Sequence, residues 1–272
     1  MKIYFNILII SIFFLGSCNL TGNRGNNSGK NAGEKGIRIV REYYNDGKLK
    51  SEISMKDNTK HGITRKYNKQ NKMISSVNYA DNKKEGVATN YYPSGKVHST
   101  ITYMQDRKNG QEVWYYENGR PFRENPFVDD KINGMQKFYY ENGKIKAEVP
   151  FKNNFPGIGL KEYTEEGILM KKYPAIKIDE INHIALADKF ILNISLTNSA
   201  RRVKFYIGKL DEGKYMNDNL YEILNRGGVA TLTYDVPLGY VKMETINIVA
   251  KYTTRAGVPY ITQKSYNLAL KH

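Results

Sequence analysis

Apolar and polar residues alternate with a period of two through residues 37–173, and a turn signal interrupts the alternation every 24 residues. Such alternation is typical of β-strands, whereas the 3.6-residue period of helices is absent. The interrupting residue, called the turn position below, is glycine in five copies and asparagine in one: Gly47, Asn71, Gly95, Gly119, Gly143 and Gly167. A fixed period over six copies indicates a repeat architecture, and we predict a run of six β-hairpins.

The turn position is expected to have a positive φ, because glycine adopts that region without strain and asparagine tolerates it. Pro93, two residues before Gly95, suits the second residue of a type I turn. Each hairpin is therefore predicted to close with a type I turn followed by a left-handed residue.

A column of tyrosines accompanies the turns, one standing four residues before each turn position: Tyr43, Tyr67, Tyr91, Tyr115, Tyr139 and Tyr163. Apolar or aromatic residues recur two, six and eight residues after the turn, as Ile145, Val149 and Phe151 do in the fifth copy. The tyrosine should lie opposite the residue two places after the turn. We therefore expect the tyrosines to join the apolar face as a structural ladder.

The segments between hairpins are also regular, with Asp or Asn ten or eleven residues after most turn positions: Asp57-Asn58, Asp81-Asn82, Asp129-Asp130 and Asn153-Asn154. A second glycine follows, as at Gly62 and Gly110. Asx side chains initiate turns and glycine lets the chain reverse. The pattern predicts an antiparallel meander of roughly eleven or twelve short strands.

The N-terminus has the pattern of a signal peptide over residues 1–18: a lysine, an apolar run from Ile7 to Leu15, and then small residues. Residues 15–18 resemble the bacterial lipobox, in which Cys18 would become the lipidated first residue. A plain secretory signal with an incidental cysteine is the alternative. Cys18 is the only cysteine, so we expect no intramolecular disulfide. Residues 19–36 are almost devoid of apolar side chains and are predicted to form a flexible tether.

A different pattern begins after the repeats, over residues 174–272. The periodic glycines stop, and longer alternating runs follow, as in Phe190–Leu196 and Val203–Ile207. About seven such strands in roughly 100 residues predict an immunoglobulin-like β-sandwich. The expected organisation is a signal peptide (1–18), a tether (19–36), hairpin repeats (37–173) and a sandwich (174–272), an all-β protein.

The formal net charge of +15 is spread along the chain, with 25 basic and 17 acidic residues in the repeats. A basic protein commonly binds nucleic acid, but an exported lipoprotein seldom meets it, so we expect no nucleic-acid partner. Anionic lipid headgroups or acidic glycans are more available, and an evenly spread charge that serves solubility is the alternative.

No enzyme signature is evident. The four histidines, at 61, 98, 183 and 272, are scattered without metal-ligand spacing. There is no Gly-Xaa-Ser-Xaa-Gly elbow and no glycine-rich phosphate loop. A paired-carboxylate site assembled from distant residues is the alternative. We therefore expect no catalytic residues, no metal and no cofactor.

The repeat unit Tyr-Tyr-Glu-Asn-Gly-Lys (residues 139–144), with the alternation after it and a Lys-Xaa-Asn/His/Glu-Gly linker, resembles the MORN-repeat variant family of bacteria. The resemblance covers about half the chain. It implies a stack of β-hairpins. Some proteins of this variant family are labelled antitoxin components, and better-studied MORN proteins act as scaffolds or membrane-proximal modules.

One face of the predicted sheet carries aromatic residues beside basic ones. If the residue three places before the turn pairs with the residue one place after the turn, Tyr116 faces Arg120 and Tyr140 faces Lys144. The next pairs would be Trp114 with Phe122 and Phe138 with Lys146. Exposed aromatics beside arginine have the composition of a binding hot spot, for a protein or an acidic glycan. The candidate partner-binding residues are Trp114, Tyr116, Arg120, Phe122, Phe138 and Tyr140.

These observations together predict a non-enzymatic protein of the bacterial cell envelope, anchored in the membrane, most simply the outer membrane, through lipid on Cys18. It would act as a protein-binding or scaffold module, and its partner would be another envelope protein. The alternative is an immunity or antitoxin protein that neutralises a specific toxin.

Overall fold

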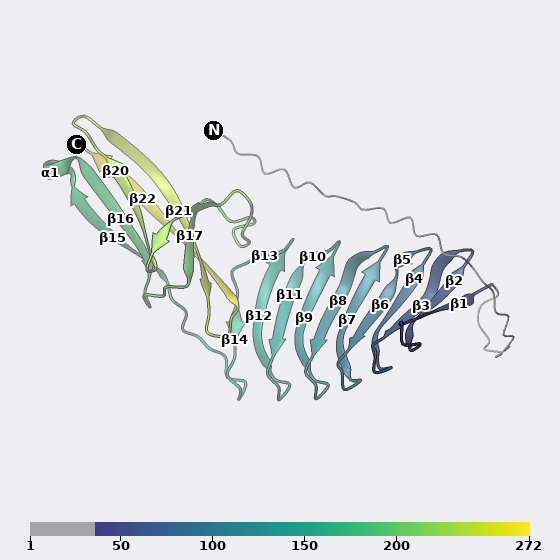
Figure 1. The fold of residues 1–272 in the computed structure, drawn as a ribbon. Helices are drawn as coiled ribbons and strands as arrows, with labels where there is room; N and C mark the ends of the chain where they lie inside the picture. The colour runs from purple at the N-terminus through teal and green to yellow at the C-terminus, as the bar shows by residue number, and fades with distance from the viewer. Residues whose placement is uncertain (1–35) are drawn as a thin grey trace. The chain divides into compact units, whose positions relative to one another are not determined.

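A computed structural model describes residues 36–272, and Gly36–His272 form one compact unit (Figure 1). The expected signal peptide, the lipidation of Cys18 and nearly all of the expected tether lie outside these residues. Within the described range, no helix is long and apolar enough to cross a bilayer. The regular secondary structure of the described chain is almost entirely β-strand, as the alternation predicts.

The repeats form one antiparallel sheet whose hairpins follow one another in sequence order (Figure 1). Its strands are β1 (Arg38–Tyr43), β2 (Leu49–Lys56), β3 (Thr59–Tyr67), β4 (Met73–Ala80), β5 (Lys83–Lys84), β6 (Gly86–Tyr91), β7 (Val97–Met104), β8 (Arg107–Tyr115), β9 (Pro121–Val128), β10 (Lys131–Ile132), β11 (Gly134–Tyr139), β12 (Ile145–Lys152), β13 (Phe155–Pro156) and β14 (Lys161–Glu162). The main path is β1-β2-β3-β4-β6-β7-β8-β9-β11-β12-β13, and β5, β10 and β14 pair with β4, β9 and β12. The predicted meander is thus confirmed.

The turn positions have the predicted backbone, with φ between +57° at Asn71 and +91° at Gly167. In the fourth hairpin the Gly119 N–H donates to the Tyr116 carbonyl, and the Tyr116 N–H donates to the Arg120 carbonyl. This is a type I turn followed by a left-handed residue.

In the first five hairpins a β-bulge follows the turn, and the register beyond it differs from the predicted one. We call it the second bulge, because the left-handed turn residue forms the first. Tyr115 pairs with Pro121 as expected, but Trp114 then pairs with Arg123, which leaves Phe122 as the extra residue. In the fifth hairpin Phe138 likewise pairs with Ala147 rather than with Lys146. An extra residue reverses which face the following side chains occupy. The predicted pairs Trp114/Phe122 and Phe138/Lys146 are therefore wrong.

This bulge also separates the tyrosines, and the residues two places after the turn that pair with them, from the apolar residues six and eight places after the turn. We call the inner face the side that buries Ser51, Thr64, Ala88, Ser99, Glu112, Asn125, Gln136, Ala147 and Val149. The tyrosines four residues before the turns lie on the opposite, outer face, where Tyr67 donates to Glu52 at 3.1 Å and Tyr163 donates to Glu148 at 3.0 Å. In the first five hairpins the tyrosine lies opposite the residue two places after the turn, as predicted. The face that they share is the outer one, however, and not the face that buries the residues six places after the turn.

The other edge of the sheet consists of two-residue turns in which both residues have positive φ, as at Asp129 and Asp130. Asx residues are favoured in such turns. The second residue also joins neighbouring repeats: the Asp130 carboxylate accepts the Lys108 N–H at 2.8 Å, and the Asp130 N–H donates to the Lys108 carbonyl. The same clasp recurs in the neighbouring turns, so the Asx column links successive hairpins.

Two four-stranded sheets make up the C-terminal region. Their strands are β15 (Ile176–His183), β16 (Lys189–Leu196), β17 (Val203–Ile207), β18 (Tyr221–Ile223), β19 (Asn225–Arg226), β20 (Val229–Asp235), β21 (Val241–Thr253) and β22 (Pro259–Lys271), with one short helix, α1 (Ile184–Ala187). The strand orders are β15-β16-β20-β19 and β18-β17-β21-β22. These correspond to orders A-B-E-D and C′-C-F-G of immunoglobulin-like domains. Alternate residues such as Leu192, Phe205 and Ile248 fill the core between the sheets. The predicted sandwich is confirmed.

The last two repeats pack against the sandwich. Ala147 and Val149 of β12 share a buried apolar cluster with Leu160 and with Val258 of the β21–β22 turn. Thr254 donates a buried hydrogen bond of 2.6 Å to Glu162. The sandwich therefore covers the C-terminal end of the repeat stack, where repeat proteins commonly need a cap.

Candidate partner-binding surface

The only tryptophan of the chain, Trp114, lies on the inner face of β8 and has Arg123 of β9 as its cross-strand neighbour. The Arg123 guanidinium carbon is 5.3 Å from the centre of the indole and 6.0 Å from that of Phe122. A cation within about 6 Å of a ring is stabilised by about 0.5–1 kcal/mol at an exposed site. Arg123 therefore joins two aromatic side chains of the fourth hairpin.

Further rings extend this contact into a continuous set. The His98 ring is 5.0 Å from Trp114 and 4.4 Å from Tyr92, and the Phe122 ring is 5.4 Å from Tyr116. Phe122 keeps 39% of its surface exposed, an unusual fraction for phenylalanine. We call this set the aromatic row; its members are Tyr92, His98, Trp114, Tyr116, Phe122 and Arg123. It spans the third and fourth hairpins.

A buried polar network lies beside Trp114. Glu112 accepts hydrogen bonds from Lys108 at 2.6 Å and from Asn125 at 2.5 Å, and Gln136 donates to Asn125 at 2.6 Å. Burial acts to raise the pKa of Glu112, but these donors and the nearby Trp114 indole outweigh it and hold the pKa below its ordinary value. Glu112 is therefore a buried carboxylate rather than a neutral acid.

Two donors of the aromatic row have no acceptor. Trp114 Nε1 and Arg123 Nε are buried, and neither completes a hydrogen bond. The indole lies close enough to Glu112 to help lower its pKa, although its Nε1 does not complete a hydrogen bond to that carboxylate. A buried donor without an acceptor costs about 1–3 kcal/mol. The row therefore contains polar groups whose burial is not fully compensated within the sheet.

The six sequence-predicted residues do not all lie together. Trp114, Tyr116 and Phe122 belong to the row. Arg120 instead reaches the next turn, where its guanidinium donates to the Glu141 carbonyl at 3.1 Å. Tyr116 has a structural part as well, because its hydroxyl donates to the Tyr139 carbonyl at 2.9 Å.

Phe138 and Tyr140 lie at the junction with the sandwich. Phe138 packs against the buried cluster that contains Val149 and Val258, so it belongs to the contact between repeats and sandwich. The Tyr140 hydroxyl donates to the Tyr163 carbonyl at 2.7 Å. Neither residue contacts the aromatic row through a described ring or hydrogen bond.

Sequence reasoning missed three members of the row: Tyr92, His98 and Arg123. Their signal was present as columns three residues before, and three and four residues after, the turn position. These columns meet because of the second bulge. It places the residues three and four places after the turn beside the residue five places before the turn. Without that bulge, Arg123 is assigned to the wrong face.

The described residues contain no group of three or more His, Cys, Asp or Glu side chains that could hold a metal ion. The histidines are dispersed, as the sequence indicates. His61 lies 3.4 Å from Asp81, His98 belongs to the row, His183 precedes α1, and His272 contacts the Val236 carbonyl at 2.8 Å.

Four segments of the chain match the family described as MORN repeat variant: residues 39–57, 84–105, 108–129 and 132–153. This confirms the repeat type within residues 39–153. No curated protein matches the chain. A solved structure, the extracellular domain of a one component system from B. thetaiotaomicron, is 11% identical, with 88% of this chain and 31% of that chain covered and a TM-score of 0.24. The chain thus spans less than a third of that protein, and this similarity bears on neither fold nor function.

Proposed function

We propose that this protein is a non-enzymatic, lipid-anchored envelope protein that binds a protein partner through the aromatic row. The observation that supports the proposal is the grouping of Trp114, Phe122 and Arg123 on one face, two of them with unsatisfied buried donors. Tryptophan, tyrosine and arginine dominate the energetics of protein interfaces. The anchor is the lipid expected on Cys18.

The partner should present an acidic segment. Arg123 has no carboxylate partner among the described residues, and a guanidinium pairs best with a carboxylate, which can accept two parallel hydrogen bonds. The repeats as a whole carry 25 basic and 17 acidic residues, so their net positive charge would also attract an acidic partner over a longer range.

The test is a comparison of variants in a capture experiment. The full chain, purified in detergent and immobilised, is exposed to solubilised membranes, and bound proteins are identified by mass spectrometry. We expect one protein to be captured by wild type and by the control Lys209→Ala, and lost from Trp114→Ala and Arg123→Gln. Lys209 is an exposed residue of the sandwich and lies outside the row.

Circular dichroism checks that the variants fold. Trp114→Phe, which retains an aromatic ring at this position, is tested beside Trp114→Ala in case the alanine variant does not fold. Equal capture by folded Trp114→Ala and by wild type would exclude the row as the binding site. A captured ligand that survives protease but not glycosidase would show that the row binds an acidic glycan instead. Identification of a toxin as the captured protein would favour the immunity function over the envelope scaffold.

A further inference from the structure

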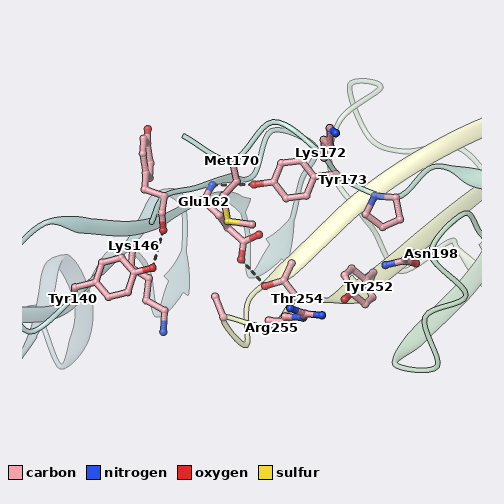
Figure 2. A pocket seen from close by; sticks show the side chains of 13 residues that line it. Tyr140, Lys146, Glu162, Met170, Lys172, Tyr173, Asn198, Tyr252, Thr254 and Arg255 are labelled. Carbon is pink, nitrogen blue, oxygen red and sulfur yellow. Dashed lines mark hydrogen bonds between the residues drawn. The ribbon is translucent and has the colours of Figure 1, made fainter. Parts of the chain in front are cut away.

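A cleft of about 490 Å³ lies where the fifth and sixth repeats meet the sandwich (Figure 2). Tyr140 and Lys146 line it from the repeats, and Tyr252 and Arg255 line it from the sandwich. Lys172 lines it from the segment that connects the two. A volume of several hundred Å³ is typical of sites for small molecules.

The charge of this cleft is mainly positive. Lys146, Lys172 and Arg255 come from three separate parts of the chain, and none of them has a carboxylate partner among the described residues. Lys146 is half-buried, with its ammonium 5.7 Å from the Tyr140 ring. A half-buried cation without a counter-ion is a natural contact for an anionic group.

The one carboxylate that lines the cleft is already occupied. Glu162 is buried, and its Oε1 accepts the Thr254 hydroxyl at 2.6 Å, as the dashed line in Figure 2 shows. The Glu162 N–H donates to the Tyr173 hydroxyl at 2.9 Å. These bonds fix Glu162 as part of the wall, so the charged lining consists of this one carboxylate and three cations.

The lining also provides rings. Tyr140 and Tyr252 both border the cleft, and the Tyr140 hydroxyl is held by the Tyr163 carbonyl, which fixes the ring (Figure 2). Aromatic side chains supply rigid contact area at a low cost in conformational entropy. The combination of fixed rings with unpaired cations suits a ring-shaped ligand that carries an acidic group.

We propose that this cleft binds a sugar that bears an anionic group, a carboxylate or a phosphate. The acidic group would lie between Lys146 and Arg255, and the ring would lie against Tyr140 or Tyr252. This site is separate from the aromatic row, since none of its residues belongs to the row.

The test is isothermal titration of the full chain, purified in detergent, with trigalacturonic acid, galactotriose, glucose 6-phosphate and inorganic phosphate. We expect binding of the uronate or of the sugar phosphate, and no binding of galactotriose. Loss of one charge-assisted contact in Lys146→Gln or Arg255→Gln should weaken binding about tenfold. The control Lys209→Gln, which removes the same charge from a remote loop, should bind as wild type does.

The two anions distinguish the source of the acidic group: uronate binding assigns a carboxylate, and sugar phosphate binding assigns a phosphate. Binding of inorganic phosphate as tight as that of glucose 6-phosphate would refute the role of the ring. Equal affinity in Lys146→Gln, Arg255→Gln and wild type, or no binding of any probe, would refute the site. Because Trp114→Ala leaves the cleft intact, failure here is separate from failure of the partner-binding surface.

Discussion

Replacement of Glu112 by glutamine should destabilise the repeats, although it changes only one oxygen into an amide. Glu112 accepts from two donors at once, Lys108 and Asn125, and its side chain is 5% exposed. Glutamine has one acceptor oxygen and one NH2 donor group. One of the two partners, Lys108 or Asn125, would therefore point its own N–H at another hydrogen-bond donor. Asn125 cannot rotate to relieve it, because its oxygen already accepts from Gln136.

The magnitude follows from these contacts. The lost hydrogen bond to a charged group is worth about 1.5–3 kcal/mol, and an unsatisfied buried donor costs about 1–3 kcal/mol. Allowing for overlap between the two terms, Glu112→Gln should lower the free energy of unfolding by about 2–4 kcal/mol. The assay is urea unfolding followed by the fluorescence of Trp114, the only tryptophan and a neighbour of Glu112.

The control is Glu117→Gln, the same chemical change at an exposed residue beside the turn at Gly119. It should shift the free energy of unfolding by less than about 0.5 kcal/mol. If Glu112→Gln is as stable as this control, the hydrogen-bond assignment of the network is wrong.

The same carboxylate makes stability depend on pH. The pKa of Glu112 in the folded chain lies below its ordinary value of 4.5, so its contribution is fully present above about pH 4.5. It is lost as the pH falls through the lowered folded value, where the carboxylate is protonated. The unfolding free energy of Glu112→Gln should therefore fall less steeply in acid than that of wild type, which urea titrations at several pH values would measure.

Three further expectations concern the turn, the junction and the anchor. Gly119 has φ +85° and no heavy atom within 4 Å of an added Cβ, so Gly119→Val should cost about 1–3 kcal/mol from backbone strain alone in urea unfolding, and Gly119→Asn clearly less. Thr254→Val removes the donor to buried Glu162 and should cost about 1.5–3 kcal/mol, against little change for Thr253→Val; equal melting of the two variants would contradict this. Cys18→Ala should move the protein from the membrane to the soluble fraction, and mass spectrometry of the wild type should find acyl groups on Cys18.

The repeats were the most predictable part because their signals are local and recur six times. Glycine or asparagine at each turn position specifies a positive φ, and the structure has it in all six hairpins, including Asn71 at +57°. The paired Asx residues likewise occupy turns with positive φ. Their link to the preceding repeat is a contact between distant residues, which local turn chemistry does not reveal.

The register beyond the turn could not be predicted because the second bulge has no residue signature. The residue three places after the turn is Phe122 in the fourth hairpin, Lys146 in the fifth and His98 in the third. One extra residue moves all later side chains to the opposite face. The error was therefore systematic: it misplaced the tyrosine ladder, hid Arg123 and paired Trp114 with the wrong partner. The short strands β18 and β19 were missed because two or three residues are too few to show alternation.

Comparison of columns within the chain separates side chains that hold the stack from those that could serve a partner. The column four residues before the turn is tyrosine in all six copies, and in the structure the hydroxyls of Tyr67 and Tyr163 contact the neighbouring hairpin. The column five residues before the turn contains five residue types in its six copies: Glu42, Lys66, Asn90, Trp114, Phe138 and Glu162. A side chain that holds a stack must meet the same neighbour in every repeat, so its identity is repeated. The varied column includes Trp114 at the centre of the aromatic row, Phe138 at the junction and Glu162 in the wall of the cleft. Functions that belong to a single repeat are therefore expected at positions whose residue differs between the copies.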